Sequence, residues 1–493
     1  MISRRRLLNG IGLAAALSSV HAAQPPAAAP LLPQEWAQTF DVIVVGGGGA
    51  GLAAAVAAAQ KKASVCLIEK MPLLGGDTLR STGYLSCVEP RRQTLNGILD
   101  SEALHFRQTM QAGLNRANPQ LVQTMVSETP KTVAWLEECG VLFQDSVYEI
   151  YGSGYRRCLK PVLPRGTAYI RALSQRAIEL GVRIRLETSL TDIYLDAAGE
   201  AVGVAVQSRT GATEAIGARR GIVIATGGYG ANAALIEKYA PVLKGLPTDN
   251  SPGSTGDALF IARRLGIALE GLEYVECVAG NPPGRKTHAR LFIPSDFILI
   301  NEKGERFVEE DALRRDLTMA ILAQPHRRCY TVFDSQGVAH LDPISQKGLY
   351  QALVADEAWS APTLEELAAL MHVPAAAFIG AIEHYNDKAA AGAKTRLNYK
   401  GTDKCSRVGC TPLTEGPYWA YEVGLTVHYT PGGIVINEKG LCLTTRGRAV
   451  GRLWAAGEAT GSVHGANRLG GNGLADALTF GRLAGAAAAQ NLP

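Results

Sequence analysis

The chain has 493 residues, of which 47% are hydrophobic and 19% are charged, and its formal net charge at pH 7 is +4. This length is too great for one compact unit, so we expect two domains. The small positive charge, with no basic stripe interleaved with aromatic residues, does not indicate a nucleic-acid partner.

The N-terminus reads as a targeting segment. The run SRRRLL at residues 3–8 resembles a twin-arginine signal, an apolar stretch over residues 11–20 follows, and VHA at residues 20–22 is a plausible cleavage site. The apolar stretch is too short to span a bilayer, and no other stretch could cross one, so we expect no stable membrane insertion. We predict a signal peptide over residues 1–23 and a Pro/Ala-rich linker over residues 24–37, and hence a periplasmic protein exported in its folded state. The alternatives are an ordinary signal peptide or a basic tail.

A dinucleotide fingerprint follows the linker. An apolar strand runs into Gly46-x-Gly48-x-x-Gly51, an Ala-rich helix comes next, and Glu69 closes the following strand-like run. In this motif Gly46 makes the tight turn, Gly48 lets the backbone approach a pyrophosphate, and Gly51 allows helix and strand to pack closely. The helix N-terminus faces the phosphates with its free N–H groups. Glu69 predicts that the bound dinucleotide has a free ribose diol, and both NAD and FAD have one. The alternative to a binding site is a plain βαβ turn.

Helix and strand patterns continue beyond the fingerprint. Residues 119–140 and 167–181 read as helices, and Pro130 is expected to interrupt the first of them. The text from 182 to 228 alternates like the strands of a hairpin insertion that returns to the central sheet.

The layout indicates a discontinuous nucleotide domain with an inserted cap. Strand-like and helical runs fill the middle of the chain, and Gly-rich strand–loop–helix text returns near the C-terminus. We therefore predict an α/β fold, with a Rossmann-like dinucleotide-binding domain over residues 38–265 and 416–493 and an α+β capping domain over residues 266–415.

Nine cysteines are an odd number for an exported protein, and several lie in apolar runs that indicate buried thiols. Cys405 and Cys410 could pair in a loop, which the sequence leaves open. The chain has no Cys-x-x-Cys-His, so it attaches no c-type haem itself, and no cluster of metal ligands stands out.

Six further segments carry a family resemblance. They are GGDT (75–78), ATGG (225–228), STGDAL (254–259), NEKGERFVEE (301–310), HYTPGG (428–433) and AAGEATGSVHGANRLGGN (455–472). Together with the glycine motif they resemble the soluble, periplasmic fumarate reductase family, which includes flavocytochrome c fumarate reductases and urocanate reductase. The resemblance covers residues 38–488, and its last segment is the most specific. It implies FAD rather than NAD as the bound dinucleotide, and an α,β-unsaturated acid as the substrate.

The same segments indicate how FAD is held. Glu458 follows a strand and can bind a ribityl hydroxyl, and a helix begins after Gly471-Asn472 with its positive end toward the N1/C2=O edge of the flavin. No histidine lies between Asp77 and Gly83, where some relatives attach FAD covalently, so we expect noncovalent FAD. The expected cofactor-binding residues are Gly46, Gly48, Gly49, Ala50, Gly51, Glu69, Lys70, Gly75, Gly76, Asp77, Thr78, Gly83, Thr226, Gly227, Gly228, Asp257, Gly457, Glu458, Arg468, Gly471, Asn472, Gly473 and Leu474.

The resemblance implies two residues that clamp the substrate carboxylate. They are the His of H-x-T-x-G-G, at His428, and the Arg of G-A-N-R-L-G-G-N, at Arg468. An Arg offers a planar fork that binds both carboxylate oxygens. The alternative is a core His and an Arg paired with Asp476.

The proton donor of the family is an Arg several positions after R-F-x-N-E. An ungapped register from Arg306 places this residue at Arg314, and Arg315 is the alternative with one gap. An Arg is a poor free acid because its pKa lies above about 12, so it needs a strongly basic transition state and prompt resupply of its proton. A solvated charge run is the alternative reading.

Two family features are absent. The usual His-Pro-Thr becomes Val278-Ala279-Gly280, and the Glu and Arg of the proton relay fall on Arg290 and Ile293. Since these positions help hold a second carboxylate, fumarate is disfavoured. We expect a monocarboxylate whose far end is apolar or bulky.

The predicted function is a flavin-dependent ene-reductase that transfers hydride from reduced FAD to the β-carbon of the acid, with the proton coming from Arg314. Electrons are expected from a separate c-type cytochrome. One alternative is the reverse chemistry, a dehydrogenase of the 3-ketosteroid or tricarballylate kind, and another is a non-catalytic electron-transfer flavoprotein. An NAD-dependent enzyme is poorly supported because no second G-x-G-x-x-G unit occurs.

Overall fold

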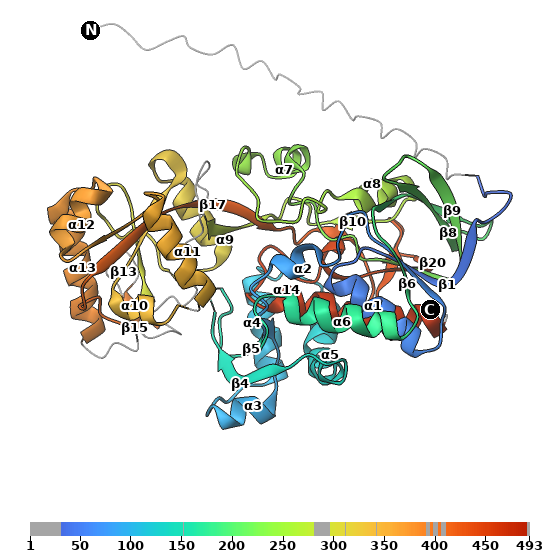
Figure 1. The fold of residues 1–493 in the computed structure, drawn as a ribbon, viewed down its shortest axis with the longest axis horizontal. Coiled ribbons are helices and arrows are strands. Elements are labelled where there is room, and N and C mark those ends of the chain that lie inside the picture. The colour runs from blue at the N-terminus through green and yellow to red at the C-terminus, as the bar shows by residue number, and fades with distance from the viewer. Residues whose placement is uncertain are drawn as a thin grey trace, which may run out of the picture.

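The computed structural model describes residues 31–150, 152–280, 296–310, 312–341, 343–390, 395–397, 403–405 and 411–490. The expected signal peptide, the first half of the linker, Arg290, Ile293 and Cys410 lie outside the described residues. Figure 1 shows two groups of elements, one around a large sheet that contains β1 and one around a smaller sheet that contains β13, with the long strand β17 reaching from one toward the other.

The larger sheet has eight strands in the order β19-β20-β9-β1-β2-β6, with β7 pairing β8 and β8 pairing β9. Its central pairs, β1–β2, β1–β9, β2–β6 and β9–β20, are parallel. Val42 to Val45 of β1 are buried, as expected of a parallel strand covered on both faces. The strands are β1 (Gln38–Val45), β2 (Val65–Ile68), β6 (Arg183–Arg185), β7 (Thr188–Leu195), β8 (Ala201–Ser208), β9 (Thr213–Ile224), β19 (Leu441–Leu443) and β20 (Ala449–Ala455).

The predicted hairpin insertion is confirmed. β7, β8 and the first half of β9 form an antiparallel meander, and β9 from Ile216 onward pairs in parallel with β1. The end of β9 therefore lies beside the end of β1, and the loops that follow both strands meet at one edge of the sheet.

Helices α1 (Gly49–Gln60) and α14 (Asn472–Gln490) pack against each other next to this sheet. A Cβ atom on Gly481 or Gly485 of α14 would overlap the backbone of Ala50 or Ala54 in α1. The two helices thus approach to a distance that only glycine permits, which brings a segment from the far C-terminus onto the first helix of the fold.

Helix α5 (Pro119–Glu138) corrects one expectation, because it runs through Pro130 without interruption. Proline removes one backbone donor and usually kinks a helix. Here Val126 and Val133, before and after the proline, are both buried in the core, and this burial holds the helix together across the missing hydrogen bond.

The smaller sheet has five antiparallel strands. They are β11 (Glu276–Gly280), β12 (Ile298–Ile300), β13 (Cys329–Phe333), β14 (Ala358–Ala361) and β17 (Tyr418–Tyr429), and β17 pairs with β11, β13 and β14. β17 begins just after the expected domain boundary at residue 416 and is the central strand of this sheet. The boundaries themselves stay predictions, whereas the α/β fold class is confirmed by the architecture.

The remaining elements surround the two sheets. Within the described part of the chain, no helix is long and apolar enough to cross a membrane. The elements outside the two sheets and helices α1, α5 and α14 are α2 (Gly76–Arg80), β3 (Leu85–Ser86), α3 (Pro90–Leu95), α4 (Glu102–Ala112), β4 (Phe143–Tyr148), β5 (Cys158–Pro161), α6 (Thr167–Glu179), α7 (Ala233–Tyr239), η1 (Pro241–Leu243), α8 (Asp257–Arg264), β10 (Leu269–Glu270), α9 (Arg314–Leu322), η3 (Pro325–Arg327), α10 (Ser335–Ala339), α11 (Pro343–Val354), α12 (Leu364–Met371), α13 (Ala375–Ala390), β15 (Thr395–Leu397), β16 (Asp403–Cys405), β18 (Gly433–Ile434) and η4 (Gly457–Ala459).

Candidate active site

The turn between β1 and α1 distinguishes two kinds of glycine. Gly46 has φ +108°, and a Cβ atom on Gly51 would overlap the carbonyl oxygen of Gly46, so the protein itself requires glycine at both positions. Gly48 has φ −78°, which any residue adopts, and a Cβ there would meet nothing closer than Gly75 O at 3.8 Å. The packing of the protein therefore does not require glycine at this position, whereas a ligand lying against Gly48 would. The loop thus fits a bound dinucleotide.

The acidic residue of the fingerprint lies beside this loop. Glu69, at the end of β2, accepts hydrogen bonds from the backbone N–H groups of Gly47 at 2.7 Å and Met71 at 2.7 Å. Nearby, Lys70 Nζ lies 2.7 Å from Asp257 Oδ2, and the buried hydroxyl of Thr226 has no protein partner. An unpaired buried hydroxyl in the wall of a cavity suits a ligand that supplies the missing hydrogen bond.

One cavity extends from the glycine loop to the smaller sheet. Most of the expected cofactor residues line it, and the other six make their close contacts with the protein. Those in the wall are Gly46, Gly48, Gly49, Ala50, Glu69, Lys70, Gly76, Asp77, Thr78, Thr226, Gly227, Asp257, Glu458, Arg468, Gly471, Gly473 and Leu474. Those outside it are Gly51, Gly75, Gly83, Gly228, Gly457 and Asn472.

The N-terminus of α14 opens onto this cavity through Gly471, Gly473 and Leu474. Asn472 at the same turn is fully buried and holds the helix end from behind. Its Oδ1 lies 3.0 Å from His105 Nε2, and its Nδ2 donates to Thr109 Oγ1 at 3.1 Å. The positive end of a helix is thereby fixed against the cavity wall, where it favours negative charge on a ligand.

Two half-buried carboxyl groups, Asp77 and Glu458, lie in the wall of the cavity. Asp77 accepts hydrogen bonds from Ser251 N–H and the Ser254 hydroxyl, and Glu458 Oε1 accepts from Thr430 N–H at 2.9 Å and the Thr430 hydroxyl at 3.0 Å. Burial, followed by the neighbouring carboxylate of Asp77, raises the pKa of Glu458 to about 8. Burial also raises the pKa of Asp77. A neutral carboxyl group can both donate and accept a hydrogen bond with sugar hydroxyls.

The raised pKa of Glu458 predicts a pH-dependent stability of the flavin-free protein. Glu458 stays protonated in the folded state while the unfolded chain ionises, so the free energy of unfolding should fall as the pH rises from about 4.5 through about 8. Denaturant titrations of flavin-free protein across this range test it. Glu458→Gln should flatten the slope, and the same replacement at exposed Glu438 should not. An unchanged slope in Glu458→Gln would contradict the assignment.

At the other end of the cavity two arginines converge on one carboxylate. Arg468 Nη2 lies 3.1 Å from Glu276 Oε2, Arg468 N–H donates to Glu276 Oε1, and Arg314 Nη1 lies 3.3 Å from Glu276 Oε2. The side chains of Arg468, Arg314 and Glu276 are 5%, 8% and 2% exposed. Burial alone would raise the pKa of Glu276, but Arg468 and then Arg314 outweigh it and lower that pKa.

Arg468 is also oriented by an aromatic ring. Its guanidinium lies over the ring of Tyr429, 4.2 Å from the centroid, and the Tyr429 hydroxyl donates to Asp476 at 3.4 Å. Asp476 also lies 3.2 Å from His464. The expected alternative, an ion pair between Arg468 and Asp476, is therefore replaced by a stacking contact and an ion pair with Glu276.

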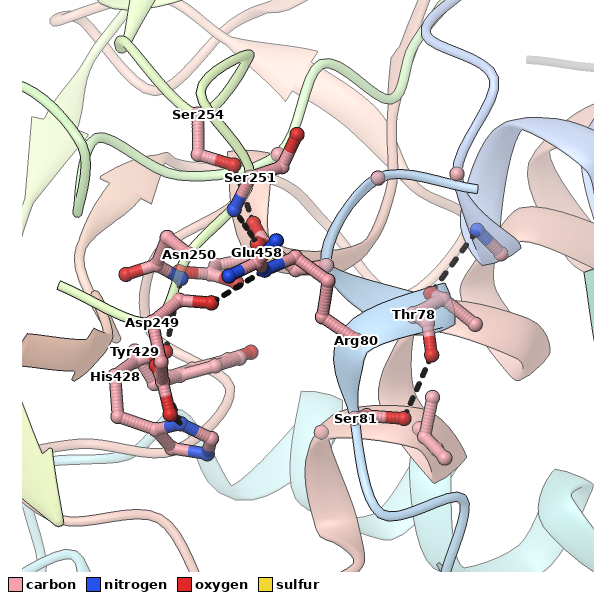
Figure 2. Close-up of a pocket in the computed structure, with 18 of the residues that line it drawn as sticks. Thr78, Arg80, Ser81, Asp249, Asn250, Ser251, Ser254, His428, Tyr429 and Glu458 are labelled. Carbon is pink, nitrogen blue, oxygen red and sulfur yellow. Dashed lines mark hydrogen bonds and ion pairs between the residues drawn. The ribbon is translucent and has the colours of Figure 1, made fainter. Parts of the chain in front are cut away.

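His428 lies at the same end of the cavity, on β17 beside Tyr429. Its Nδ1 is 3.1 Å from both carboxylate oxygens of Asp249, and Figure 2 shows Asp249 between His428 and Arg80. Asn250 Nδ2 donates to the His428 backbone carbonyl at 2.9 Å. The carboxylate at Nδ1 orients the ring, so Nε2 is the atom available to a ligand.

Among the described residues, the wall beyond these groups is largely apolar, with Thr331 as a polar member. It contains Val278 and Ala279 of β11, two of the three residues that stand where the resemblance predicts a polar motif. Around them the smaller sheet and α9 contribute Phe297, Leu299, Leu317, Tyr421 and Val423. This part of the cavity offers a bulky apolar group more contact than it offers a second carboxylate.

The three expected catalytic residues, Arg314, His428 and Arg468, all line this cavity, whereas Arg315 points its half-exposed side chain at Asp316. No motif in the sequence indicated Glu276, Asp249 or the serines that hold Asp77. The only signal for Glu276 was an acidic residue at the start of a strand rich in apolar residues. The cysteines at 66, 87, 139, 158, 277, 329 and 442 are buried and free.

The known proteins that this chain resembles indicate the same cofactor as the geometry of the site does. The family described as FAD binding domain matches residues 41–474. Fumarate reductase (cytochrome) of Shewanella frigidimarina is 32% identical over 456 residues, which cover 92% of this chain and 77% of that protein. NADH:fumarate oxidoreductase of Klebsiella pneumoniae (strain 342) is 33% identical over 463 residues, which cover 92% of this chain but 48% of that protein, so this chain spans about half its length.

A solved structure shows the same architecture. The open conformation of a flavocytochrome c3 fumarate reductase superposes with a TM-score of 0.72 at 29% identity, and the match covers 93% of this chain and 79% of that one. Fold and site together define an FAD-dependent oxidoreductase. The chain belongs to the FAD-dependent fumarate reductase family, as its motifs predict.

Proposed function

We propose that the protein reduces the C=C bond of an α,β-unsaturated monocarboxylate that carries an apolar group at its far end. The observation that supports this most is the cavity itself, which joins the dinucleotide loop, two buried arginines and an apolar wall. Fumarate would place its second carboxylate against Val278 and Ala279, which cannot pair with it. A buried carboxylate without a partner is strongly unfavourable.

The chain supplies binding groups and a proton. FAD, when bound and reduced by the electron donor, would supply hydride to the β-carbon. Arg468 and His428 bind the substrate carboxylate, which draws electron density toward it and leaves negative charge on the α-carbon. Arg314 donates the proton to that carbon, and the basicity of the carbanion compensates for the high pKa of a guanidinium. The apolar wall excludes water from the reacting carbons and strengthens these charge interactions.

The test is anaerobic reoxidation of the dithionite-reduced protein by a panel of acids. Crotonate- and cinnamate-like monocarboxylates should reoxidise the flavin faster than fumarate does. A clear preference for fumarate would contradict the monocarboxylate assignment. No reoxidation by any enoate would favour the non-catalytic flavoprotein, and flavin reduction by a saturated or steroid substrate would favour the dehydrogenase.

FAD is expected to be held without a covalent bond. No histidine occurs between Asp77 and Gly83, and the cavity wall there contacts the ligand site through glycine backbone, carboxyl and hydroxyl groups. Acid precipitation should therefore release all of the flavin into the supernatant. Yellow colour retained by the washed pellet would show a covalent link.

The reductase is also proposed to work in the periplasm, after twin-arginine export, with a separate c-type cytochrome as electron donor. This rests on the SRRRLL motif and on the absence of a Cys-x-x-Cys-His motif from the sequence. Replacement of Arg4 and Arg5 by lysine should leave the protein in the cytoplasmic fraction, whereas an ordinary signal peptide would tolerate the change.

A further inference from the structure

Glu276 places a negative charge inside the group that binds the substrate carboxylate. It begins β11 opposite Tyr429 of β17, and this pairing brings it next to the residues at the end of β17. Its two oxygens contact Arg468 through both backbone and side chain and reach Arg314 at 3.3 Å. Glu276 is 2% exposed and is absent from the residues that line the cavity, so it lies behind the two arginines rather than in the path of the substrate.

The net positive charge of this group of side chains is low for a site with two arginines. Of the three described side chains, Arg468, Arg314 and Glu276, two guanidinium groups and one carboxylate leave a single positive charge, and the lowered pKa of Glu276 keeps its carboxylate ionised. His428 adds no net positive charge, because the carboxylate of Asp249 lies 3.1 Å from its Nδ1. Arg80 is exposed and donates to the backbone carbonyl of Asp249, so water screens its charge.

We propose that Glu276 sets the charge preference of the substrate site by neutralising one of the two arginines, so that the site accepts one carboxylate and disfavours two. The proposal rests on the proposed reductase function and names the residue that determines its substrate class. The apolar residues Val278 and Ala279 withhold a partner from a second carboxylate, and Glu276 adds a repulsive charge against it. Such repulsion of the wrong substrate is a common route to specificity.

The experiment uses the FAD-loaded enzyme with Glu276 replaced by glutamine, which keeps the shape and can still accept a hydrogen bond from Arg468 N–H. We measure kcat/KM for fumarate and for crotonate with a reduced viologen dye as donor. The ratio of the fumarate value to the crotonate value should rise by about tenfold or more, because a buried charge acts strongly at short range. Glu276→Asp keeps the charge and should keep the ratio of the unmodified enzyme.

A matched control is Glu270→Gln. Glu270 lies on β10, is exposed and accepts a hydrogen bond from the Ser462 hydroxyl, so its replacement removes the same charge elsewhere. The ratio should stay unchanged in this variant. An unchanged ratio in Glu276→Gln, with crotonate still reduced, would overturn the role of Glu276 alone. A complete lack of enoate reduction by the unmodified enzyme would instead overturn the proposed function.

A second measurement covers the case in which Glu276→Gln fails to fold. Binding of saturated acids to the oxidised, unmodified enzyme perturbs the flavin spectrum and gives a dissociation constant. Butanoate should bind more tightly than succinate, since only one carboxylate finds a net positive charge. Tighter binding of succinate would contradict the proposed preference.

Discussion

Replacement of Arg314 by alanine should abolish turnover while FAD stays bound. Arg314 begins α9 and lies in the cavity wall at the end remote from the glycine loop, so the change leaves every residue around the cofactor loop intact. Loss of a positioned proton donor lowers kcat by about 10²- to 10⁴-fold. The measurement is anaerobic oxidation of a reduced viologen dye by crotonate, with the flavin content of each preparation taken from its visible spectrum.

Arg315 provides the matched control, because it is the neighbouring residue and the alternative proton donor. Its side chain is 50% exposed and pairs with Asp316. Arg315→Ala should therefore change kcat by no more than about twofold, as is usual for an exposed position. If Arg315→Ala inactivates the enzyme and Arg314→Ala does not, the ungapped register from Arg306 is wrong by one residue.

Arg314→Lys separates charge from geometry. Lysine keeps the positive charge that Glu276 balances, so folding and FAD binding should be preserved. A lysine ammonium is a point charge on a flexible stem and cannot reach both Glu276 and the α-carbon through a planar fork. The variant should recover only a small part of the activity. Full activity would show that Arg314 acts through charge alone.

The parts of the fold that the sequence predicted are those with local signals. The glycine spacing at residues 46–51 defines β1, its turn and α1, because Gly46 and Gly51 each answer a local steric requirement. The antiparallel meander that returns to the sheet is equally local, because its strands adjoin in the sequence. Pro130 was misjudged because its local effect on a helix is overridden by burial in the core, which depends on segments distant in sequence.

The residues of the candidate site likewise divide into those with a local sequence signal and those without one. His428 and Arg468 lie in segments with a recognisable family pattern, whereas Glu276 and Asp249 are isolated acidic residues without a motif. Glu276 reaches Arg468 because β11 pairs with β17 in a register that sets Glu276 opposite Tyr429. That register joins segments about 150 residues apart and is decided by packing of the whole sheet, so no local pattern predicts it.

The second large effect is expected at Gly48. A valine there should give a folded protein without flavin, and hence without activity. The backbone of Gly48 has φ −78° and the nearest atom to its Cβ position is 3.8 Å away, so the protein accommodates the first carbon of a side chain. A branched side chain would fill the space in which the fingerprint places the pyrophosphate, at the N-terminus of α1.

Gly51→Ala tests a glycine that the packing of the protein requires, rather than one that a ligand requires. Its Cβ would overlap the carbonyl oxygen of Gly46, so β1 and α1 must move apart, and the protein should lose stability as well as flavin. Thermal unfolding and flavin content together separate the two cases. Gly48→Val should keep a melting temperature close to that of the flavin-free unmodified protein, and Gly51→Ala should fall well below it. Retention of stoichiometric FAD by Gly48→Val would mean that the dinucleotide does not lie against this glycine, and the cofactor would have to be placed elsewhere in the cavity.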